Sequence, residues 1–291
     1  MILVSGGTGY IGRCLVARLA EEGEKVRVLA RRQARLPEGV EIVKGNVATG
    51  QGLAEAMEGV ERVVHLVAII RETGDQTFDG VIRQGAENVV NAAKAAGVVK
   101  FVHQSAIGAR DDPFYGYHKA KWDAEQAVRN SGLKHTVVRP SLVFGGGDEF
   151  FTTLASLVRW NPIVPIAGEG KTRFQPIWVE DVVTCLIQCL QEGVHDDKTV
   201  EIGGPEHLTY EEMLDLVKRV LGARRLKAHI PLFLMRPIAA VMEFVLPKPP
   251  VTREQLKMLA IDNITELDAV ERQFGFKPKR LADGLDYLKR R

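Results

Sequence analysis

Three glycines near the start of the chain constrain its fold more than any other feature. Gly6, Gly9 and Gly12 follow a short apolar run, ILVS at 2–5, and precede a segment of helical character at 13–23. Between a strand and a helix, such glycines allow a tight turn, the approach of a pyrophosphate and close helix–strand packing. The first N–H groups of the helix then point at the phosphates. A plain turn is the simpler alternative, but the strand–turn–helix context predicts a dinucleotide site.

The first half of the chain alternates valine-rich runs with helical segments. Strands are expected at 25–30, 40–45, 62–68, 100–106 and 135–140, and helices at 81–97 and 115–131. The strands show little polar alternation, as expected when helices cover both faces of a parallel sheet. The repeated βα units therefore predict an α/β fold, a doubly wound parallel Rossmann sheet with right-handed crossovers.

The pattern loosens in the second half of the chain, where a second domain is expected. We expect the dinucleotide-binding Rossmann domain to comprise 1–145 and returning segments at about 176–204, because TVEIGGP (199–205) is typical of a further strand. A smaller, mainly helical lobe for substrate or other interactions is expected from 146–175 and 205–291.

Within this smaller lobe, TYEEMLDLVKRVLG at 209–222 predicts an amphipathic helix, whereas 230–250 is apolar but interrupted by prolines. Large side chains in the lobe are candidates for lining a substrate pocket. They are Phe150, Phe151, Trp160, Phe174, Gln175 and Trp178. Such a lining favours a small-molecule substrate that is apolar or bears a ring.

The composition excludes several function classes. The 291 residues include 39 Lys and Arg against 37 Asp and Glu, so the net charge is only +2. This balance gives no basic face for nucleic acid, and we expect no nucleic-acid partner. Three cysteines are too few for a disulfide framework and indicate a reducing compartment. Cys185 and Cys189 share a helical face without further ligands, so we expect buried core residues and no metal site.

The chain shows no secretory signal before its first strand and no apolar run of about eighteen residues, so a cytoplasmic protein is expected. The apolar stretch 230–246 follows the basic segment ARRLKAH at 223–229. This combination is compatible with peripheral association with a membrane or a protein complex. Closure of the substrate pocket by the same stretch is the alternative. The sequence carries no signal of an oligomeric state.

Two arginines at the end of the second expected strand indicate the cofactor preference. Ala30 ends this strand and is followed directly by Arg31 and Arg32. An acidic residue here would bind the ribose 2′-hydroxyl of NAD, whereas guanidinium groups suit the 2′-phosphate of NADP. A solvated basic turn is the alternative. We favour NADP(H) as cofactor, with NAD(H) as the other candidate.

The segment YGYHKAK at 115–121 contains Tyr-x-x-x-Lys twice, as Tyr115 with Lys119 and Tyr117 with Lys121. Residues four apart on a helix share a face, and a nearby ammonium is expected to lower the pKa of the tyrosine. The face of Tyr117 continues through small apolar residues that suit packing on the sheet, whereas the face of Tyr115 continues through polar ones. Tyr117 and Lys121 are therefore the expected catalytic pair.

Ser105 adds a third element at the end of the fifth expected strand, where open α/β sheets bind ligands. Its hydroxyl could hold a carbonyl or hydroxyl oxygen in line with Tyr117. A turn-forming serine and a partly buried aromatic residue are the structural alternatives. The glycine-rich turn beside them favours the catalytic interpretation.

With these residues the chain resembles the short-chain dehydrogenase/reductase superfamily, in the extended and atypical branch that includes NAD-dependent epimerases and dehydratases. The matching segments are GGTGYIG, FVHQSA, Tyr117-x-x-x-Lys121 followed by Glu125, VVRPSLVFG, FQPIWVEDV and IGGPEHLTYEEML. Within that branch it is most similar to bacterial relatives of the nucleotide-binding accessory subunit of respiratory complex I. The proline-broken tail IPLFLMRPIAAVMEFVLPKPPVT and the following REQLKMLAIDN carry this second resemblance.

The resemblance implies a role for each matching residue. Tyr117 would donate or accept the proton, Lys121 would bind the nicotinamide ribose and tune Tyr117, and Ser105 would orient the reacting group. Pro140 and the residues after it would border the nicotinamide. The implied cofactor contacts are Gly6, Thr8, Gly9, Tyr10, Ile11, Gly12, Arg31, Arg32, Asn46, Val47, Val67, Ala68, Tyr117, Lys121, Pro140 and Val143.

The expected function is that of an NADP(H)-binding oxidoreductase that transfers a hydride to or from a carbonyl or alcohol carbon, with Tyr117 as general acid or base. A nucleotide-binding accessory or assembly protein with little turnover and a redox-sensing protein are alternatives. A sugar-nucleotide epimerase or dehydratase is another, against which Ile82 counts because the epimerase pattern has asparagine there. Asn46 stands where relatives carry an aspartate near the adenine, and its amide can still hydrogen-bond.

Overall fold

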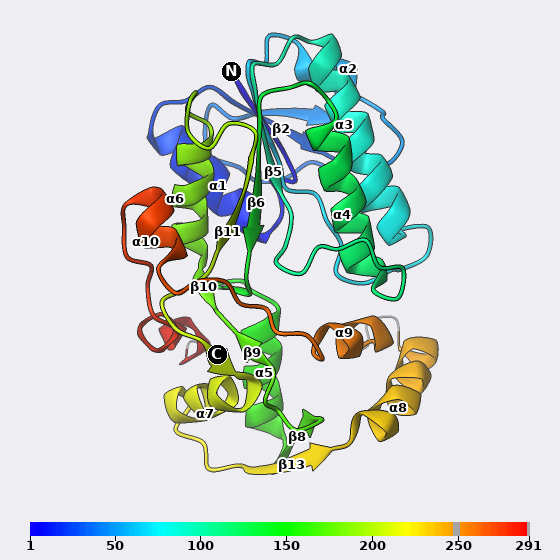
Figure 1. Cartoon of the computed structure of the whole chain (residues 1–291), viewed down its shortest axis with the longest axis vertical. Helices are drawn as coiled ribbons and strands as arrows, with labels where there is room; N and C mark the ends of the chain where they lie inside the picture. Colours follow the sequence, from blue (N-terminus) through cyan, green and yellow to red (C-terminus); the bar gives the residue numbers. More distant parts are fainter. Residues whose placement is uncertain (247–250, 290–291) are drawn as a thin grey trace. The chain divides into compact units, whose positions relative to one another are not determined.

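The computed structural model describes residues 1–246 and 251–289, and the chain forms two compact units (Figure 1). Unit 1 comprises Met1–Pro140 and Val179–Ile202. Unit 2 comprises Ser141–Trp178 and Gly203–Arg291. The chain thus leaves unit 1 after Pro140 and returns to it for one helix and one strand.

Unit 1 is built on a seven-stranded sheet with the order β11-β6-β5-β4-β1-β2-β3. All neighbouring strands pair in parallel, which confirms the predicted Rossmann sheet. The strands are β1 (Ile2–Ser5), β2 (Val26–Ala30), β3 (Glu41–Lys44), β4 (Arg62–His65), β5 (Lys100–Gln104), β6 (His135–Pro140) and β11 (Lys198–Ile202). Their side chains are mostly buried on both faces, as the valine-rich runs require.

Helices cover both faces of this sheet (Figure 1). One face carries α1 (Tyr10–Glu21) and α6 (Val179–Cys189), which pack on each other. The other carries α2 (Leu53–Met57), α3 (Gln84–Ala95) and α4 (Gly116–Arg129). The cysteines of α6, Cys185 and Cys189, are buried and free, and burial raises the pKa of both thiols.

Two local features of unit 1 differ from the sequence-based expectation. The helix expected at 81–97 starts earlier, with one π-helical turn, η1 (Asp79–Arg83), that leads into α3. The short helix α2 was not expected. It follows Gly52, whose φ is +74° and whose Cβ, if present, would lie 2.3 Å from the carbonyl oxygen of Lys44. A close turn of this kind gives no periodic signal in the sequence.

Unit 2 combines helices with three two-stranded sheets around its own core. Its helices are α5 (Phe150–Trp160), α7 (Tyr210–Val220), α8 (Leu232–Val245), α9 (Arg253–Met258), α10 (Ala269–Phe274), η2 (Leu281–Asp283) and η3 (Leu285–Lys289). The strand pairs are β7 (Val143–Phe144) with β10 (Ile177–Trp178), β8 (Ile163–Ala167) with β13 (Leu226–Ile230), and β9 (Arg173–Phe174) with β12 (Leu208–Thr209). The amphipathic helix predicted at 209–222 is α7, which Thr209 and Glu212 cap reciprocally.

The apolar stretch 230–250 is less interrupted than its prolines indicate. Residues 232–245 form one helix, α8, with Pro237 inside it, and 247–250 lie outside the described residues. None of the helices within 1–246 and 251–289 combines the length and the hydropathy that crossing a bilayer requires.

The expected pocket lining in unit 2 is partly wrong. Phe151 and Gln175 are completely buried, and Phe151 belongs to the core of the unit. Trp160 is 81% exposed. These residues were expected to line a pocket because their side chains are large. Size alone does not distinguish a core residue from a pocket residue.

Gln175 is a structural centre of unit 2. Its Nε2 donates to the carbonyl oxygen of Gly204 at 2.8 Å, and its Oε1 accepts from the backbone N–H of Thr265 at 2.7 Å. Its own backbone N–H donates to Ser141 Oγ at 3.2 Å. Gln175 thus contacts three distant segments, two through its side-chain amide and one through its backbone N–H.

We predict that Gln175→Leu lowers the free energy of unfolding of unit 2 by about 2 kcal/mol, because it leaves a buried carbonyl and a buried N–H without their partners. Urea unfolding followed by near-ultraviolet circular dichroism measures the loss. Gln191→Leu, the same substitution at an exposed position of unit 1, is the control and should leave the unfolding of unit 2 unchanged. Equal stability of the two variants would contradict the assigned role.

Candidate active site

The glycine-rich turn of unit 1 packs backbone directly against backbone. Gly6 has a φ of +86°, and its carbonyl oxygen accepts from the N–H of Gly9 at 2.9 Å. A Cβ on Gly12 would lie 2.1 Å from the same oxygen, so only glycine lets α1 start this close to β1. A Cβ on Gly6 would lie 3.1 Å from the backbone nitrogen of Val67, just after β4. The turn therefore fills the edge of the sheet between β1 and β4.

The start of α1 fits the phosphates of a dinucleotide. Gly9 is the N-cap, makes no side-chain cap and is exposed. A Cβ at Gly9 would meet only the carbonyl oxygen of Gly6, at 3.2 Å, so the space on the other side is open. Within the turn, Thr8, Tyr10 and Ile11 are each partly exposed. The first N–H groups of a helix lack intrahelical partners and attract an anion.

A second anion-compatible feature lies at the end of β2. A hollow of about 330 Å³ is lined by Ala30, Arg31, Arg32, Gln33, Ile42 and Lys44. This lining contains three cationic side chains and no carboxylate. Arg31 Nη1 donates to Gln76 Oε1 at 2.9 Å, whereas Arg32 and Lys44 are exposed to solvent. The hollow thus presents positive charge where the sequence predicts a ribose phosphate.

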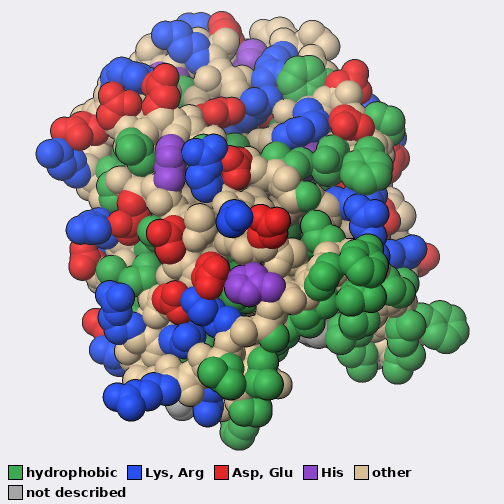
Figure 2. Space-filling view, turned by 60° about the horizontal axis from the view of Figure 1, so that its bottom comes forward, with side chains coloured by type: hydrophobic (Ala, Val, Ile, Leu, Met, Phe, Trp, Pro, Cys, Tyr) green, Lys and Arg blue, Asp and Glu red, His purple; other side chains and the backbone are tan. Residues whose placement is uncertain are grey.

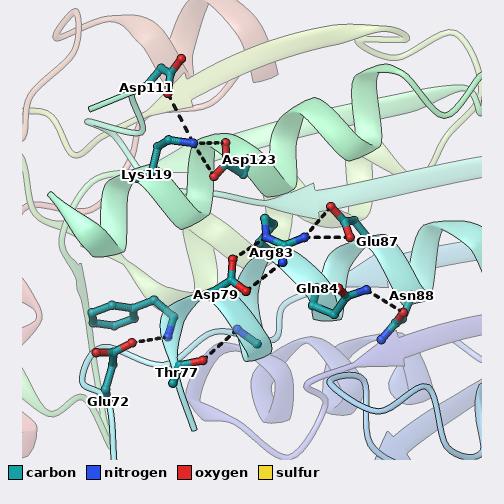
Figure 3. A network of polar contacts seen from close by, with 12 residues as sticks. Glu72, Thr77, Asp79, Arg83, Gln84, Glu87, Asn88, Asp111, Lys119 and Asp123 are labelled. Atoms are coloured by element: carbon teal, nitrogen blue, oxygen red, sulfur yellow. Dashed lines mark hydrogen bonds and ion pairs between the residues drawn. The ribbon is translucent and has the colours of Figure 1, made fainter. Parts of the chain in front are cut away.

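Two asparagines hold the loop after β3. Asn46 was expected from the sequence, whereas the role of Asn88 was missed. Asn46 Oδ1 accepts from the N–H of Ala48 at 3.1 Å, which closes a local turn. Asn88 Nδ2, on α3, donates to the carbonyl oxygens of Val47 at 2.8 Å and Ala48 at 3.2 Å. Its Oδ1 accepts from Gln84 Nε2 at 3.1 Å (Figure 3). In the sequence, the only sign of this role that we find is the polar side chain of Asn88 next to the valines of the run AENVVNAA.

The two Tyr-x-x-x-Lys pairs of α4 differ in environment. Lys119 forms an ion pair with Asp123 at 2.6 Å and with Asp111 at 3.4 Å (Figure 3). Lys121 is buried, and its Nζ donates to the carbonyl oxygen of Gln104 at 2.9 Å. Burial lowers the pKa of Lys121 to about 8, and Glu125 partly opposes this shift. Lys119 is thus occupied by carboxylates, whereas Lys121 contacts the end of β5.

Tyr117 lies buried among aromatic rings. Its ring packs edge-on against Phe78 at 5.9 Å and against His118 at 5.5 Å between centroids. Burial raises the pKa of Tyr117 to about 12. The expected lowering of this pKa by the lysine is therefore wrong for the protein alone. The loss of solvent around the phenol outweighs the attraction of an ammonium that itself contacts the Gln104 carbonyl.

The hydroxyl of Ser105 is available for a ligand. Ser105 is buried directly after β5, where its N–H donates to the carbonyl oxygen of Val138 at 2.7 Å. Its Oγ has no hydrogen-bond partner within the described part of the chain. Pro140 ends the neighbouring strand β6, and its carbonyl oxygen accepts from Ile107 at 3.1 Å. A buried hydroxyl without a partner is destabilising unless it binds something.

Two buried histidines beneath the site were also missed. Ser5, His65 and His103 lie side by side across β1, β4 and β5. His65 Nδ1 lies 2.7 Å from Ser5 Oγ, and the rings of His65 and His103 stack at 5.4 Å. Burial, with Lys121 nearby, lowers the pKa of His65 to about 3, so this ring is neutral. In the sequence, a histidine inside an apolar strand cannot be distinguished from an ordinary residue of the hydrophobic core.

A charged network fixes the segment that carries Phe78. Arg83 donates to Asp79 at 2.8 Å and to Glu87 at 2.9 Å, which ties η1 to the start of α3 (Figure 3). Glu72 Oε1 accepts from the N–H of Phe78 at 2.8 Å. Because Phe78 contacts Tyr117, the π-helical turn helps to position the phenol. Such turns are often found at functional sites.

The structure brings most of the expected site residues to one edge of the unit 1 sheet. These residues follow β1, β2, β3, β4, β5 and β6 or lie on α1 and α4. Val143 differs, because it lies in unit 2, where β7 pairs with β10. The sequence-based expectation extended the Rossmann domain to residue 145, whereas the first segment of unit 1 ends at Pro140.

Comparisons with known proteins agree with this geometry. A family described as NAD(P)H-binding matches residues 6–149. A (4-alkanoyl-5-oxo-2,5-dihydrofuran-3-yl)methyl phosphate reductase of Streptomyces griseus is 32% identical over 76% of this chain and 74% of its own length. A ceramide reductase of Caulobacter vibrioides is 29% identical over 79% of this chain and 74% of its own.

A mitochondrial protein is also similar to the chain. Subunit 9 of the NADH dehydrogenase [ubiquinone] 1 alpha subcomplex of Arabidopsis thaliana is 26% identical over 91% of this chain and 68% of its own length. The similarity therefore includes both reductases and a respiratory-complex subunit.

We predict that Lys121 makes stability depend on pH. Its pKa falls from 10.5 to about 8 on folding, so between these values the unfolded chain binds more protons. Lys121 alone should therefore add about 3 kcal/mol of stability as pH increases through this window. Urea unfolding at several pH values in this window should show this contribution to the free energy of unfolding in the wild type, and Lys121→Met should lack it. Lys94→Met, at an exposed position, is the control. Parallel pH curves for wild type and Lys121→Met would contradict the burial of a titrating amine.

Proposed function

The chain belongs to the extended branch of the NAD(P)-binding short-chain dehydrogenase/reductase superfamily, and we propose that it is an NADP(H)-dependent reductase of a ketone. One observation carries the proposal. Lys121 is buried and bound to the carbonyl of Gln104, directly before the unpartnered hydroxyl of Ser105. Tyr117 lies one turn earlier on the same helix as Lys121. This arrangement supports a proton donor and a hydroxyl acting on one substrate oxygen.

The residues have separate roles in the proposed reduction. When bound, the dinucleotide supplies a hydride to the carbonyl carbon of the substrate. Ser105 Oγ donates a hydrogen bond to the carbonyl oxygen and orients it. Tyr117 transfers its phenolic proton to that oxygen, so that the C=O group becomes CH–OH. Lys121 binds the ribose hydroxyls and stabilises the tyrosinate that remains.

The raised pKa of Tyr117 favours the reductive direction. A phenol with a pKa of about 12 is protonated at neutral pH and therefore starts the reaction as a donor. Alcohol oxidation would require the tyrosinate, which burial disfavours.

The names of the relatives support a substrate with an alkyl chain. The Streptomyces griseus reductase is named for an alkanoyl-bearing furan, and the Caulobacter vibrioides enzyme for a ceramide. Both names describe a polar, oxygen-bearing head joined to hydrocarbon. We propose unit 2 as the substrate lobe for a molecule of this class.

The proposed NADP preference rests on the hollow at the end of β2, where Arg32 is exposed beside Lys44. We predict that Arg32→Ser weakens NADPH binding by about tenfold or more, because a charge-assisted contact to the 2′-phosphate is lost. NADH binding should stay within about twofold of the wild type. Fluorescence titration with both cofactors measures the two effects.

Arg35→Ser is the matched control for this prediction. Arg35 is an exposed arginine of the same loop that does not line the hollow. If the wild type bound NADH more tightly than NADPH, or if Arg32→Ser weakened both cofactors equally, the NADP preference would be wrong.

The two tyrosines of YGYHKAK give a direct test of the catalytic assignment. We predict that Tyr117→Phe slows ketone reduction by about a hundredfold or more, since the proton donor is removed. NADPH affinity should change little. Tyr115→Phe, in the overlapping register, should retain most of the activity. Loss of NADPH absorbance with long-chain 3-oxo acids measures turnover. Equal effects of the two substitutions would contradict the assignment.

A second candidate is a nucleotide-binding accessory protein with little turnover, which the Arabidopsis thaliana subunit supports. Ser105 and Lys121 argue for the reductase, since an accessory role does not require a buried, unpartnered hydroxyl beside a buried amine. A redox-sensing protein would bind NADP and NADPH with different affinities and show no turnover. A sugar-nucleotide epimerase is less compatible, because Ile82 is buried and apolar where that pattern has an amide.

A further inference from the structure

Helix α8 of unit 2 exposes its apolar side chains to solvent. Phe233 is 71% exposed, Val241 62% and Phe244 93%. Leu234, Ile238, Val245 and Leu246 are also exposed. Figure 2 shows hydrophobic side chains gathered on this face of the molecule. An apolar surface of this kind on one helix indicates a binding partner.

The spacing along α8 makes the exposed side chains one continuous stripe. Phe233, Pro237, Val241 and Phe244 recur at intervals of four, four and three residues, so they share a helix face. Ala239 is the buried residue of the helix. In an ordinary surface helix the stripe of large apolar residues faces the core, and here it faces outward.

The charge beside the stripe is positive. Arg236 is exposed and has no hydrogen-bond or ion-pair partner among residues 1–246 and 251–289. Glu243 lies on the same side of the helix but is paired with Arg253 at 2.7 Å. Two residues before β13, Arg224 is also exposed. The border of the stripe on α8 thus carries Arg236 as an uncompensated basic group.

The apolar surface continues next to α8 in the chain. Leu226, on β13, is 70% exposed, and its register partner Ile163, on β8, is 50% exposed. β13 leads into α8 through Pro231. The exposed apolar side chains of β8 and β13 thus lie next to α8 along the chain.

We propose that α8 is a peripheral membrane anchor that lies in the headgroup region of a bilayer containing anionic lipid. The apolar stripe would enter the acyl boundary, and Arg236 and Arg224 would contact phosphate groups. A helix of 14 residues is about 21 Å long, too short to span the hydrocarbon core of about 30 Å. The inference rests on the proposed function in one respect, since a ketone with a long alkyl chain resides in a bilayer.

A second copy of the chain fits this surface less well than lipid does. In a two-fold symmetric contact the same patch meets itself, so two copies of the unpaired Arg236 would border one contact. Like charges across a contact oppose association. Anionic headgroups instead supply the complementary charge and leave the stripe in an apolar medium.

Flotation of the full chain with lipid vesicles, without cofactor, tests the proposal. One set of vesicles contains phosphatidylcholine only, and in the other about a third of the lipid is phosphatidylglycerol. The wild type should float with the anionic vesicles. Val241→Glu combined with Phe244→Glu should weaken this binding by about tenfold or more, because two apolar anchors become charges.

Matched variants separate the two contributions. Val99→Glu places the same charge at an exposed valine of unit 1 and should float like the wild type. Arg236→Gln should weaken binding to the anionic vesicles more than to the neutral ones, and the difference should shrink at high salt. NADPH titration of every variant should match the wild type, since no substitution lies in unit 1 near the glycine turn.

Three outcomes would overturn the anchor. If the wild type floats with neither set of vesicles, the protein does not bind a bilayer and the proposal is wrong. If the wild type and the double glutamate variant float equally, α8 is not the part of the protein that binds the bilayer. Wild type that dimerises without lipid, and a glutamate variant that is monomeric, would assign the stripe to a contact between copies. If vesicle binding behaves as expected but NADPH does not bind, the anchor stands and the proposed reductase function fails.

Discussion

The packing of the Gly6 carbonyl against the start of α1 is the contact on which the rest of the structure depends. Because Gly12 has no side chain, the helix begins within van der Waals distance of the turn after β1, and its first turn lies at the edge of the sheet. The same turn lies against the backbone after β4. A side chain at Gly12 would displace the helix and close the phosphate position. The roles proposed for Ser105 and Tyr117 have meaning only beside a bound dinucleotide.

The sequence was most informative where a hydrophobic or helical pattern extends over several residues. The valine-rich strands of unit 1 were recognisable because each is buried on both faces, and the structure places all of them in one parallel sheet. The helical period also separated Lys121, which is buried, from Lys119, which is paired with carboxylates. These features follow from local geometry, so they can be derived without knowledge of the tertiary structure.

What the sequence did not reveal depends on contacts between distant segments. The π-helical turn at 79–83 and the amide of Asn88 depend on a few side-chain hydrogen bonds, which leave no periodic pattern in the sequence. The pKa of Tyr117 follows from burial among Phe78 and His118 and not from its spacing to a lysine. Gln175 was taken for a pocket residue, although its side chain and backbone N–H link three other segments of unit 2.

Helix α8 shows where local and global preferences diverge. Its residues favour a helix and its apolar stripe favours burial, yet the stripe lies in solvent. Departures of this kind from a consistent pattern are expected at functional surfaces. A reductase whose substrate carries hydrocarbon and whose second unit presents an apolar helix would use both units of the chain for one function.

Amide hydrogen exchange with and without NADPH tests the central claim most directly. The N–H groups of Tyr10, Ile11 and Gly12 lie in the first turn of α1, where a helix has no internal acceptors for them. If they bind the pyrophosphate, their exchange should slow by about tenfold or more when NADPH is added. Unchanged exchange at these three residues, with NADPH bound and protection appearing elsewhere in the chain, would contradict the account.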